Sequence, residues 1–442
     1  MACLLLAASL GAAAFEGGGV HPNQWAWSAL AISLAAGIAL FRPSGTRAPK
    51  SKWLSGALAA LLGWVTFQLA PLPPSLIQSV SPEHWNALVT ARQLADHRPE
   101  KWAALSLAPA ATWQRLLAVL PAAATFLAAR EMAWWWRDRP WVAIAPVIGV
   151  AWLESVLGLV QFYLMRTAGY GGSVSGTYAN RDHFAGLLEM AFPLALLWAL
   201  AVWRGGDSNS RQKIRPALGS ALLFAVAACL LLGVVVSLSR MGFLSVLAAI
   251  ALAALVISLR HFRYPRNPRP AWQWAAVLTV PLVIAVFLPT RELVLRFADL
   301  TATEEISRDD RIGIWKDTTK VIADYVWTGT GLGAYERGLY RHKIVAPTRT
   351  VDFAHNDYLQ ALAELGIPGA VPAAALAILI LSRLVSGVLR RESKNPEWAT
   401  GLLAALLAIA VHSLADFNLY IPANALTFAW LSGAAASLET KG

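Results

Sequence analysis

The sequence predicts an all-α polytopic membrane protein with about twelve transmembrane helices and one large, partly helical loop outside the membrane. Apolar residues make up 57% of the chain and charged residues only 14%, whereas a soluble domain has about 25% charged residues. Many of the 20 tryptophans stand at the ends of apolar runs, as Trp53, Trp203 and Trp272 do. Aromatic rings anchor at a bilayer interface in such positions.

Each expected span corresponds to an apolar run, because a transmembrane helix needs roughly 20 mainly apolar residues. The runs are 2–15, 25–41, 53–70, 113–129, 141–164, 183–203, 217–237, 241–259, 271–289, 366–386, 398–415 and 422–438. The first run is short, but it lacks the basic n-region of a signal peptide, so we interpret it as a span. The chain then divides into helices one to nine (1–289), an outer loop (290–365) and helices ten to twelve (366–442).

Charge orients these spans. With a cytoplasmic N-terminus, the short inner loops carry nineteen basic and five acidic residues. These loops are 41–52, 130–140, 204–216, 260–270 and 383–397. The long loop 290–365 instead has ten basic and twelve acidic residues. This pattern follows the positive-inside rule and predicts that the long loop lies on the outer side of the membrane, which is the periplasm if the cell is Gram-negative. The net charge of +11 is then explained without nucleic-acid binding.

The sequence gives little reason to expect a cofactor. Cys3 and Cys229 both lie in apolar runs, which argues against a disulfide framework, and two cysteines are too few for the usual zinc cage. ATP and nicotinamide cofactors are absent outside the cytoplasm. The glycines of "GTGLGAY" (329–335) have no βαβ unit around them, so a dinucleotide loop is not expected. We interpret them as turn glycines in preference to a backbone anion nest.

The long outer loop contains a predicted amphipathic helix. Ile312, Trp315, Ile322 and Tyr325 recur at helical spacing, and this helix begins near Arg311. For Arg311 the sequence leaves two alternatives open, a solvated helix end and contact with a ligand.

A second outer loop, "SVSGTYANRDHFAG" (173–186), is rich in glycine and then abruptly charged. Glu189 follows it inside the next apolar run. An ionisable residue inside a span is costly and usually faces the protein interior. Glu189 is therefore expected either to pair with Arg181 or His183 and hold helices together, or to face a substrate, and we favour the second alternative.

Arg240 lies in "SLSRMG", the short turn between the seventh and eighth runs. A snorkelling membrane anchor is the alternative, but a cation on the outer side of a tight turn favours a ligand contact. Asp416, at the outer end of the eleventh run, is placed to neutralise an arginine or to be satisfied in the core. Arginine binds phosphate through a planar fork, so Arg181, Arg240 and Arg311 on one face predict an anionic lipid ligand such as a lipid pyrophosphate.

The stretch "DFAHNDYLQALAELGIPG" precedes and opens the tenth run. It brings together four polar side chains, Asp352, His355, Asn356 and Asp357. His355-Asn356, nine further residues and then Gly366-Ile367-Pro368-Gly369 resemble the ligase motif of the O-antigen ligase and polymerase superfamily. "GTYANRDHFAGLLEMAFPLAL" and "SLSRMG" resemble two further segments of this family in the same order, and the family's architecture covers essentially the whole chain.

The resemblance implies a metal-independent glycosyltransferase that moves a glycan from undecaprenyl pyrophosphate to an acceptor hydroxyl, without a cofactor. Ligases use lipid A core as acceptor, which is the expectation here; polymerases use another lipid-linked repeat unit and are the alternative. Displacement at the anomeric carbon in one step inverts its configuration.

The chemistry of the residues agrees with this implication. Histidine has an ordinary pKa near neutrality and suits general-base catalysis, so His355 is the expected base, with Asp352 or Asp357 orienting its ring. The three arginines are expected to hold the pyrophosphate, with Asn356, Glu189 and Asp416 in support. A purely structural position of His355 beside a helix N-cap is the alternative.

The sequence supports two alternatives less well. A transporter also places ionisable residues in spans, but it predicts discontinuous helices and inverted repeats, which the sequence does not display. Asp309-Asp310 is the nearest approach to a metal motif, but Arg308 and Arg311 flank it directly, so no metal is expected.

Overall fold

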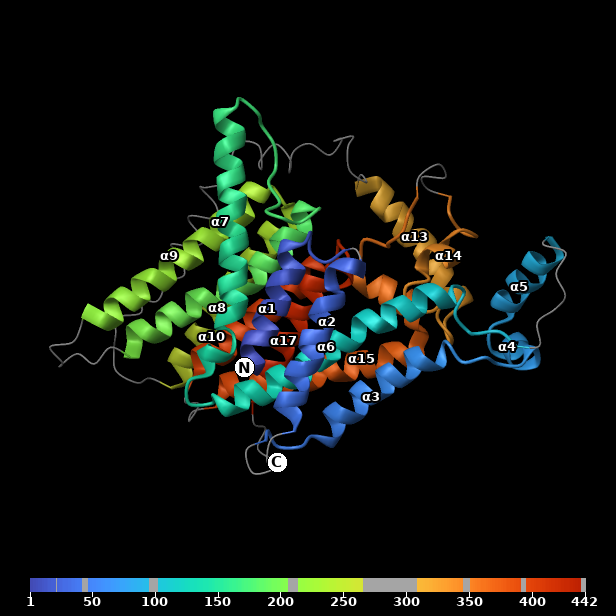
Figure 1. Ribbon diagram of the computed structural model, residues 1–442, viewed down its shortest axis with the longest axis horizontal. Coiled ribbons are helices and arrows are strands. Elements are labelled where there is room, and N and C mark those ends of the chain that lie inside the picture. Colours follow the sequence, from blue (N-terminus) through green and yellow to red (C-terminus); the bar gives the residue numbers. More distant parts are fainter. Residues whose placement is uncertain are drawn as a thin grey trace.

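The computed structural model describes residues 1–20, 22–41, 47–94, 102–205, 214–264, 308–344, 350–390 and 395–438. This part of the chain consists of helices and connecting turns without a β-strand, which confirms the all-α class (Figure 1). The helices that correspond to the predicted runs are α1 (Ala2–Phe15), α2 (Pro22–Leu40), α3 (Lys52–Phe67), α6 (Pro109–Trp135), α7 (Ala145–Thr167), α8 (Arg181–Gly205), α9 (Ile214–Ser237), α10 (Arg240–Arg263), α15 (Asp357–Leu389), α16 (Pro396–His412) and α17 (Pro422–Ala436). The predicted run 271–289 lies outside the described residues.

Six of the described helices are long and apolar enough to cross a membrane, namely α6, α7, α8, α9, α10 and α15. Helices α1, α2, α3 and α16 are also apolar, but their apolar lengths are shorter. A multi-pass membrane protein follows from these helices. Among the described residues, only these six helices meet the length and composition expected of a span, so the structure does not confirm the predicted number of about twelve.

Helix α8 forms the centre of the core. It is apolar nearly all round and buried along most of its length, as expected of a helix without a polar face. It packs against α7, α9, α10 and α16. Its first turn is thereby fixed in position at one end of the bundle, which matters because Arg181 is its first residue.

The ligase-like motif folds as a short capped helix. Asn356 precedes α15, and its Oδ1 accepts hydrogen bonds from the backbone N–H groups of Tyr358 and Leu359, both at 3.0 Å. The helical φ/ψ values break at Gly366 (φ 61°, ψ −175°), a conformation that is essentially restricted to glycine. The nine residues between Asn356 and Gly366 are therefore one short helix between its cap and its terminating glycine.

The turn "GTGLGAY" packs against this break. The N–H of Gly331 donates to the carbonyl of Glu364 at 3.1 Å, and the N–H of Gly333 donates to the Glu364 carboxylate at 2.7 Å. A Cβ on Gly329 would lie 2.1 Å from the Glu364 carbonyl oxygen, so only glycine allows the approach. All three glycines have positive φ, and the interpretation as turn glycines is confirmed.

We expect Gly366→Ala to destabilise the protein strongly. The new Cβ would lie 2.7 Å from the backbone nitrogen of Gly329, and the backbone conformation alone costs about 1–3 kcal/mol in a non-glycine residue. Gly149→Ala is the matched control, because a Cβ there meets nothing within 4 Å. Thermal unfolding in detergent should show a large drop in Tm for Gly366→Ala only; equal Tm values would contradict the role of the break.

The remaining helices gather on one side of the bundle, as Figure 1 shows, and comprise α4 (Pro74–Val80), α5 (Pro82–Leu94), α13 (Arg308–Asp324) and α14 (Tyr335–Leu339). An ion pair between Glu83 and Arg341 joins the two pairs of helices. The predicted amphipathic helix is α13, but its buried face differs in part from the expected one. Ile314, Val321 and Tyr325 are buried and Ile322 packs against them, whereas Ile312 is exposed.

Candidate active site

The structure brings the three predicted arginines together. Arg181, Arg240 and Arg311 line one small pocket, although they come from three helices that are distant in sequence. The lining is completed by Asp182, Leu238, Met241, His412, Ala415 and Asp416. We call this the arginine pocket.

Each arginine stands in the first turn of its helix. Arg181 and Arg240 are the first residues of α8 and α10, and Arg311 lies in the first turn of α13. The unpaired N–H groups and the positive end of the helix dipole both favour an anion at a helix N-terminus. Three such termini and three guanidinium groups therefore make the pocket suitable for a ligand with several negative charges.

A strained turn sets the position of Arg240. Leu238 and His355 are the two non-glycine residues with positive φ (58° and 48°) in the described part of the chain. Such conformations cost about 1–3 kcal/mol each and cluster at functional sites. Leu238 reverses the chain between α9 and α10, and Ser239 caps α10 by accepting from the N–H of Gly242 at 3.1 Å.

His355 lies beside Asp416. Its Nδ1 is 3.8 Å from Asp416 Oδ1, and its ring packs edge-on against Phe417 with centroids 5.0 Å apart. The expected orienting residues are placed differently: Asp352 is exposed, and Asp357 binds elsewhere. The carboxylate that faces the ring is therefore Asp416, which also lines the arginine pocket.

Asp416 is shared by three histidines. Besides His355, the Nε2 atoms of His183 and His412 lie 3.7 Å and 3.8 Å from its Oδ2. Burial alone raises the pKa of the Asp416 carboxyl, but the neighbouring rings of His355, His183 and His412 outweigh burial and hold this pKa well below its ordinary value. Asp416 is thus negatively charged throughout the neutral range, because a depressed pKa keeps a carboxylate ionised.

We expect Asp416→Asn to lower the glycan transfer that the sequence motif implies at least about 10-fold, because the amide keeps the size of the side chain but removes the charge that faces His355. The exposed Asp352→Asn is the matched control and should keep near-normal activity. The measurement is kcat in detergent-solubilised protein, with the pH–rate profile recorded for both variants. Equal kcat values and superimposable profiles would show that Asp416 has no part in positioning His355.

Glu189 has a different partner from either of the expected ones. Its Oε2 lies 2.9 Å from His412 Nδ1, and both side chains are fully buried. The alternative of a pair with Arg181 or His183 is therefore wrong, because α16 packs along α8 and brings His412 opposite Glu189, and the favoured substrate-facing role stays a prediction. Glu189 therefore does not line the arginine pocket itself but contacts His412, which does.

Asn356 and Asp357 hold the backbone around His355. The Asn356 side chain donates to the carbonyl of Leu414 at 2.9 Å in addition to capping α15. Asp357 Oδ2 accepts from the Ser413 hydroxyl at 2.7 Å and from the Leu419 N–H at 3.2 Å. Both residues thus tie the start of α15 to the 412–420 segment that carries Asp416.

Sequence reasoning missed a second polar cluster around Arg115. Its Nη1 donates to the Tyr420 carbonyl at 3.2 Å, and its guanidinium lies 4.8 Å from the Tyr420 ring centroid. The Tyr420 hydroxyl donates to Glu364, which also accepts from Gln360 at 3.2 Å. The sequence did offer a signal for this cluster, because Arg115 lies within the predicted run 113–129 and a charged residue in a span usually faces the protein interior.

The described residues contain no group of three or more His, Cys, Asp or Glu side chains arranged to hold a metal ion. The side chains of Asp309 and Asp310 lie outside the described part of the structure.

Residues 225–374 match the family model described as O-Antigen ligase. The matched segment includes Arg240, Arg311 and the His355 motif, whereas Arg181 and Asp416 lie outside it. The sequence has no match among curated proteins. The match covers residues 225–374 and supports the resemblance to the O-antigen ligase and polymerase superfamily that the motifs show, and the long apolar helices agree with a multi-pass membrane protein.

Proposed function

We propose that this protein is an inverting, metal-independent glycosyltransferase that moves a glycan from undecaprenyl pyrophosphate to a hydroxyl of lipid A core, at the periplasmic face of a bacterial inner membrane. The observation that carries the proposal is the arginine pocket with Asp416 in its wall and His355 beside Asp416. A pyrophosphate is the ligand chemistry that suits three guanidinium groups at three helix N-termini.

In the proposed reaction, His355 accepts the proton of the acceptor hydroxyl. Asp416 opposite Nδ1 favours the tautomer with its proton on that atom, which leaves Nε2 to act as the base. The acceptor oxygen attacks the anomeric carbon, and the bond from that carbon to the phosphate oxygen breaks. Undecaprenyl pyrophosphate leaves with the electron pair, and Arg181, Arg240 and Arg311 stabilise the negative charge that develops on it.

The break in α15 does not favour a transporter. A transporter would place such a discontinuity near the middle of the bilayer. Here the segment after Gly366 extends to Leu389 and is about 35 Å long at 1.5 Å per residue, enough to cross a hydrocarbon core of about 30 Å by itself. We therefore propose that the break lies at the membrane edge, one short helix after His355, and not in the middle of the bilayer.

The surface glycans of a deletion strain test the function. Loss of the ligase should leave lipid A core without attached glycan, while the lipid-linked glycan accumulates. Single attached repeat units would identify a polymerase instead, and an unchanged profile would contradict both. Complementation with the wild-type chain and with the exposed variant Asp352→Asn should restore the wild-type profile.

The predicted topology has its own test. Ile344→Cys, at a position 70% exposed, is introduced into a variant without Cys3 and Cys229. Asp138→Cys, in the predicted inner loop 130–140, is the matched control. A membrane-impermeant maleimide should label position 344 in intact spheroplasts and position 138 only after lysis. The reverse pattern would place the site in the cytoplasm and exclude the proposed reaction.

A further inference from the structure

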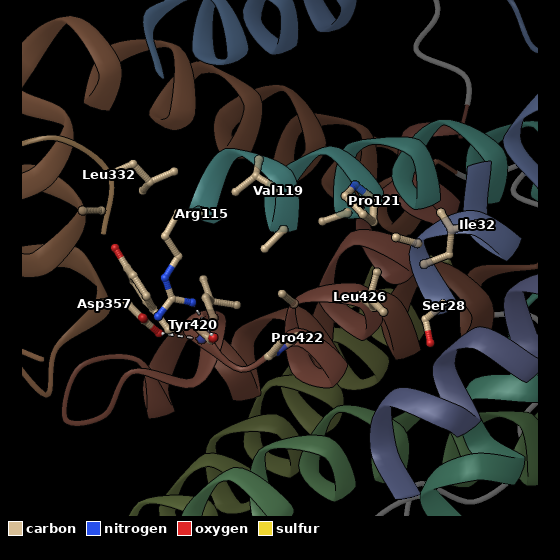
Figure 2. Close-up of a pocket in the computed structure, with 16 residues that line it drawn as sticks. Ser28, Ile32, Arg115, Val119, Pro121, Leu332, Asp357, Tyr420, Pro422 and Leu426 are labelled. Atoms are coloured by element: carbon tan, nitrogen blue, oxygen red, sulfur yellow. Dashed lines mark hydrogen bonds between the residues drawn. The ribbon is translucent and has the colours of Figure 1, made fainter. Parts of the chain in front are cut away.

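A second pocket is lined in part by the residues that follow Asp416 in the chain. Leu419, Tyr420 and Pro422 form part of its wall, together with residues of α2, α6, α15 and α17 (Figure 2). Figure 2 shows Arg115, Asp357 and Tyr420 together at one end, and Ser28, Ile32 and Leu426 at the other. The segment 412–420 therefore borders the arginine pocket through Asp416 and the second pocket through Leu419 and Tyr420.

Most of the second pocket is apolar, and small side chains leave the space open. Its cavity volume is about 200 Å³. Five alanines line it, namely Ala29, Ala118, Ala122, Ala361 and Ala425. Pro121 interrupts α6 in the same wall. A narrow site with this lining suits a hydrocarbon chain, since ligand-binding pockets are mainly apolar.

The polar end offers one cation and one unpaired acceptor. Arg115 makes one hydrogen bond in the described part of the chain, to the carbonyl of Tyr420, and so keeps further N–H donors for a ligand. Asp357 is 4% exposed, and its Oδ1 has no hydrogen-bond partner among the described residues. A buried acceptor without a partner is costly, so these groups match a head that carries both an anionic group and a hydroxyl.

We infer that the second pocket binds an acyl chain of a lipid-anchored acceptor, with the phosphate-bearing head of that lipid at Arg115 and a hydroxyl at Asp357. The inference rests on the proposed function and adds where the hydrocarbon part of the acceptor is held. The donor pyrophosphate occupies the arginine pocket, so the second pocket is left for the other substrate. His355 faces Asp416 of the arginine pocket at 3.8 Å and precedes Asp357 of the second pocket by two residues.

Filling the pocket tests the inference. Ala425→Phe and Ala118→Phe place a ring in the cavity, and Ala374→Phe, at an exposed position of α15, is the matched control. Each protein is reconstituted in nanodiscs with lipid-linked glycan. The acceptors are rough lipopolysaccharide and the same core oligosaccharide after removal of all acyl chains. The two pocket variants should raise KM for rough lipopolysaccharide at least about 10-fold, as lost uniform binding does, and leave kcat/KM for the deacylated acceptor unchanged.

Three results would overturn the inference. An equal loss of kcat/KM with both acceptors would show that the pocket does not bind the acyl chain. A rise in KM for the donor alone would assign the pocket to the isoprenoid chain of the donor. Unchanged kinetics would show that the pocket binds neither substrate. Binding of rough lipopolysaccharide to His355→Ala, measured by native mass spectrometry, is independent of turnover. Suppose that Ala425→Phe abolishes the binding of rough lipopolysaccharide but the wild-type protein transfers no glycan. This combination would refute the proposed function and leave the lipid site in place.

Discussion

His355→Ala is expected to lower kcat for glycan transfer on the order of 100- to 10,000-fold, the range that a lost general base covers. The variant should remain folded, because the helix cap is made by Asn356 and not by His355. Histidine adopts a positive φ more readily than alanine does, so the Tm of the variant is measured beside its activity. Transfer to lipid A core is measured with purified protein at saturating donor.

His342→Ala is the matched control for this variant. His342 also faces a carboxylate, with its Nε2 2.7 Å from Asp324, but it lies outside the arginine pocket. It should keep near-normal kcat. Near-normal transfer by His355→Ala, with Tm unchanged, would reduce His355 to a structural residue beside the N-cap of α15.

Arg240→Lys is expected to cost nearly as much activity as Arg240→Ala, roughly 100-fold or more, which is the loss seen when one preorganised donor to a developing charge is removed. Lysine preserves the charge but replaces a planar fork by a single ammonium group. The capped turn at Ser239 fixes the start of α10. The backbone therefore cannot move to restore the contacts that the lysine side chain loses. Steady-state kinetics with lipid-linked donor give kcat and KM for both variants.

Arg337→Lys controls for a general effect of this exchange, because Arg337 lies on α14 and stacks near Tyr340 at 5.7 Å, away from the pocket. It should have wild-type kinetics. If Arg240→Lys works as well as wild type while Arg240→Ala fails, positive charge alone is sufficient and the forked contact is wrong.

Local signals in the sequence predicted much of the site. Charge bias placed Arg181, Arg240 and Arg311 on one face, and the structure brings them to one pocket. The spacing of Asn356 and Gly366 also has a local cause, since one caps a short helix and the other ends it. Such features depend on residues close in sequence, where capping and glycine conformations are readable.

Partners across helices were not predictable in the same way. Glu189 meets His412, and not Arg181 or His183, because of the register between α8 and α16. Asp416 faces histidines from three different elements, and the Arg115 cluster joins α6 to the 412–420 segment. Several helices in a membrane satisfy the same apolar pattern in more than one rotation, so packing alone decides which polar side chains meet.

The most direct test of the proposed function is transfer by the purified protein. Wild-type protein in nanodiscs, supplied with undecaprenyl-pyrophosphate-linked glycan and rough lipopolysaccharide, should form glycan-bearing lipopolysaccharide and free undecaprenyl pyrophosphate in equal amounts, with inverted anomeric configuration. Polymerised glycan on the donor lipid, without transfer to lipopolysaccharide, would contradict the ligase assignment. The absence of any transfer, in protein shown to bind the donor, would contradict the glycosyltransferase function itself.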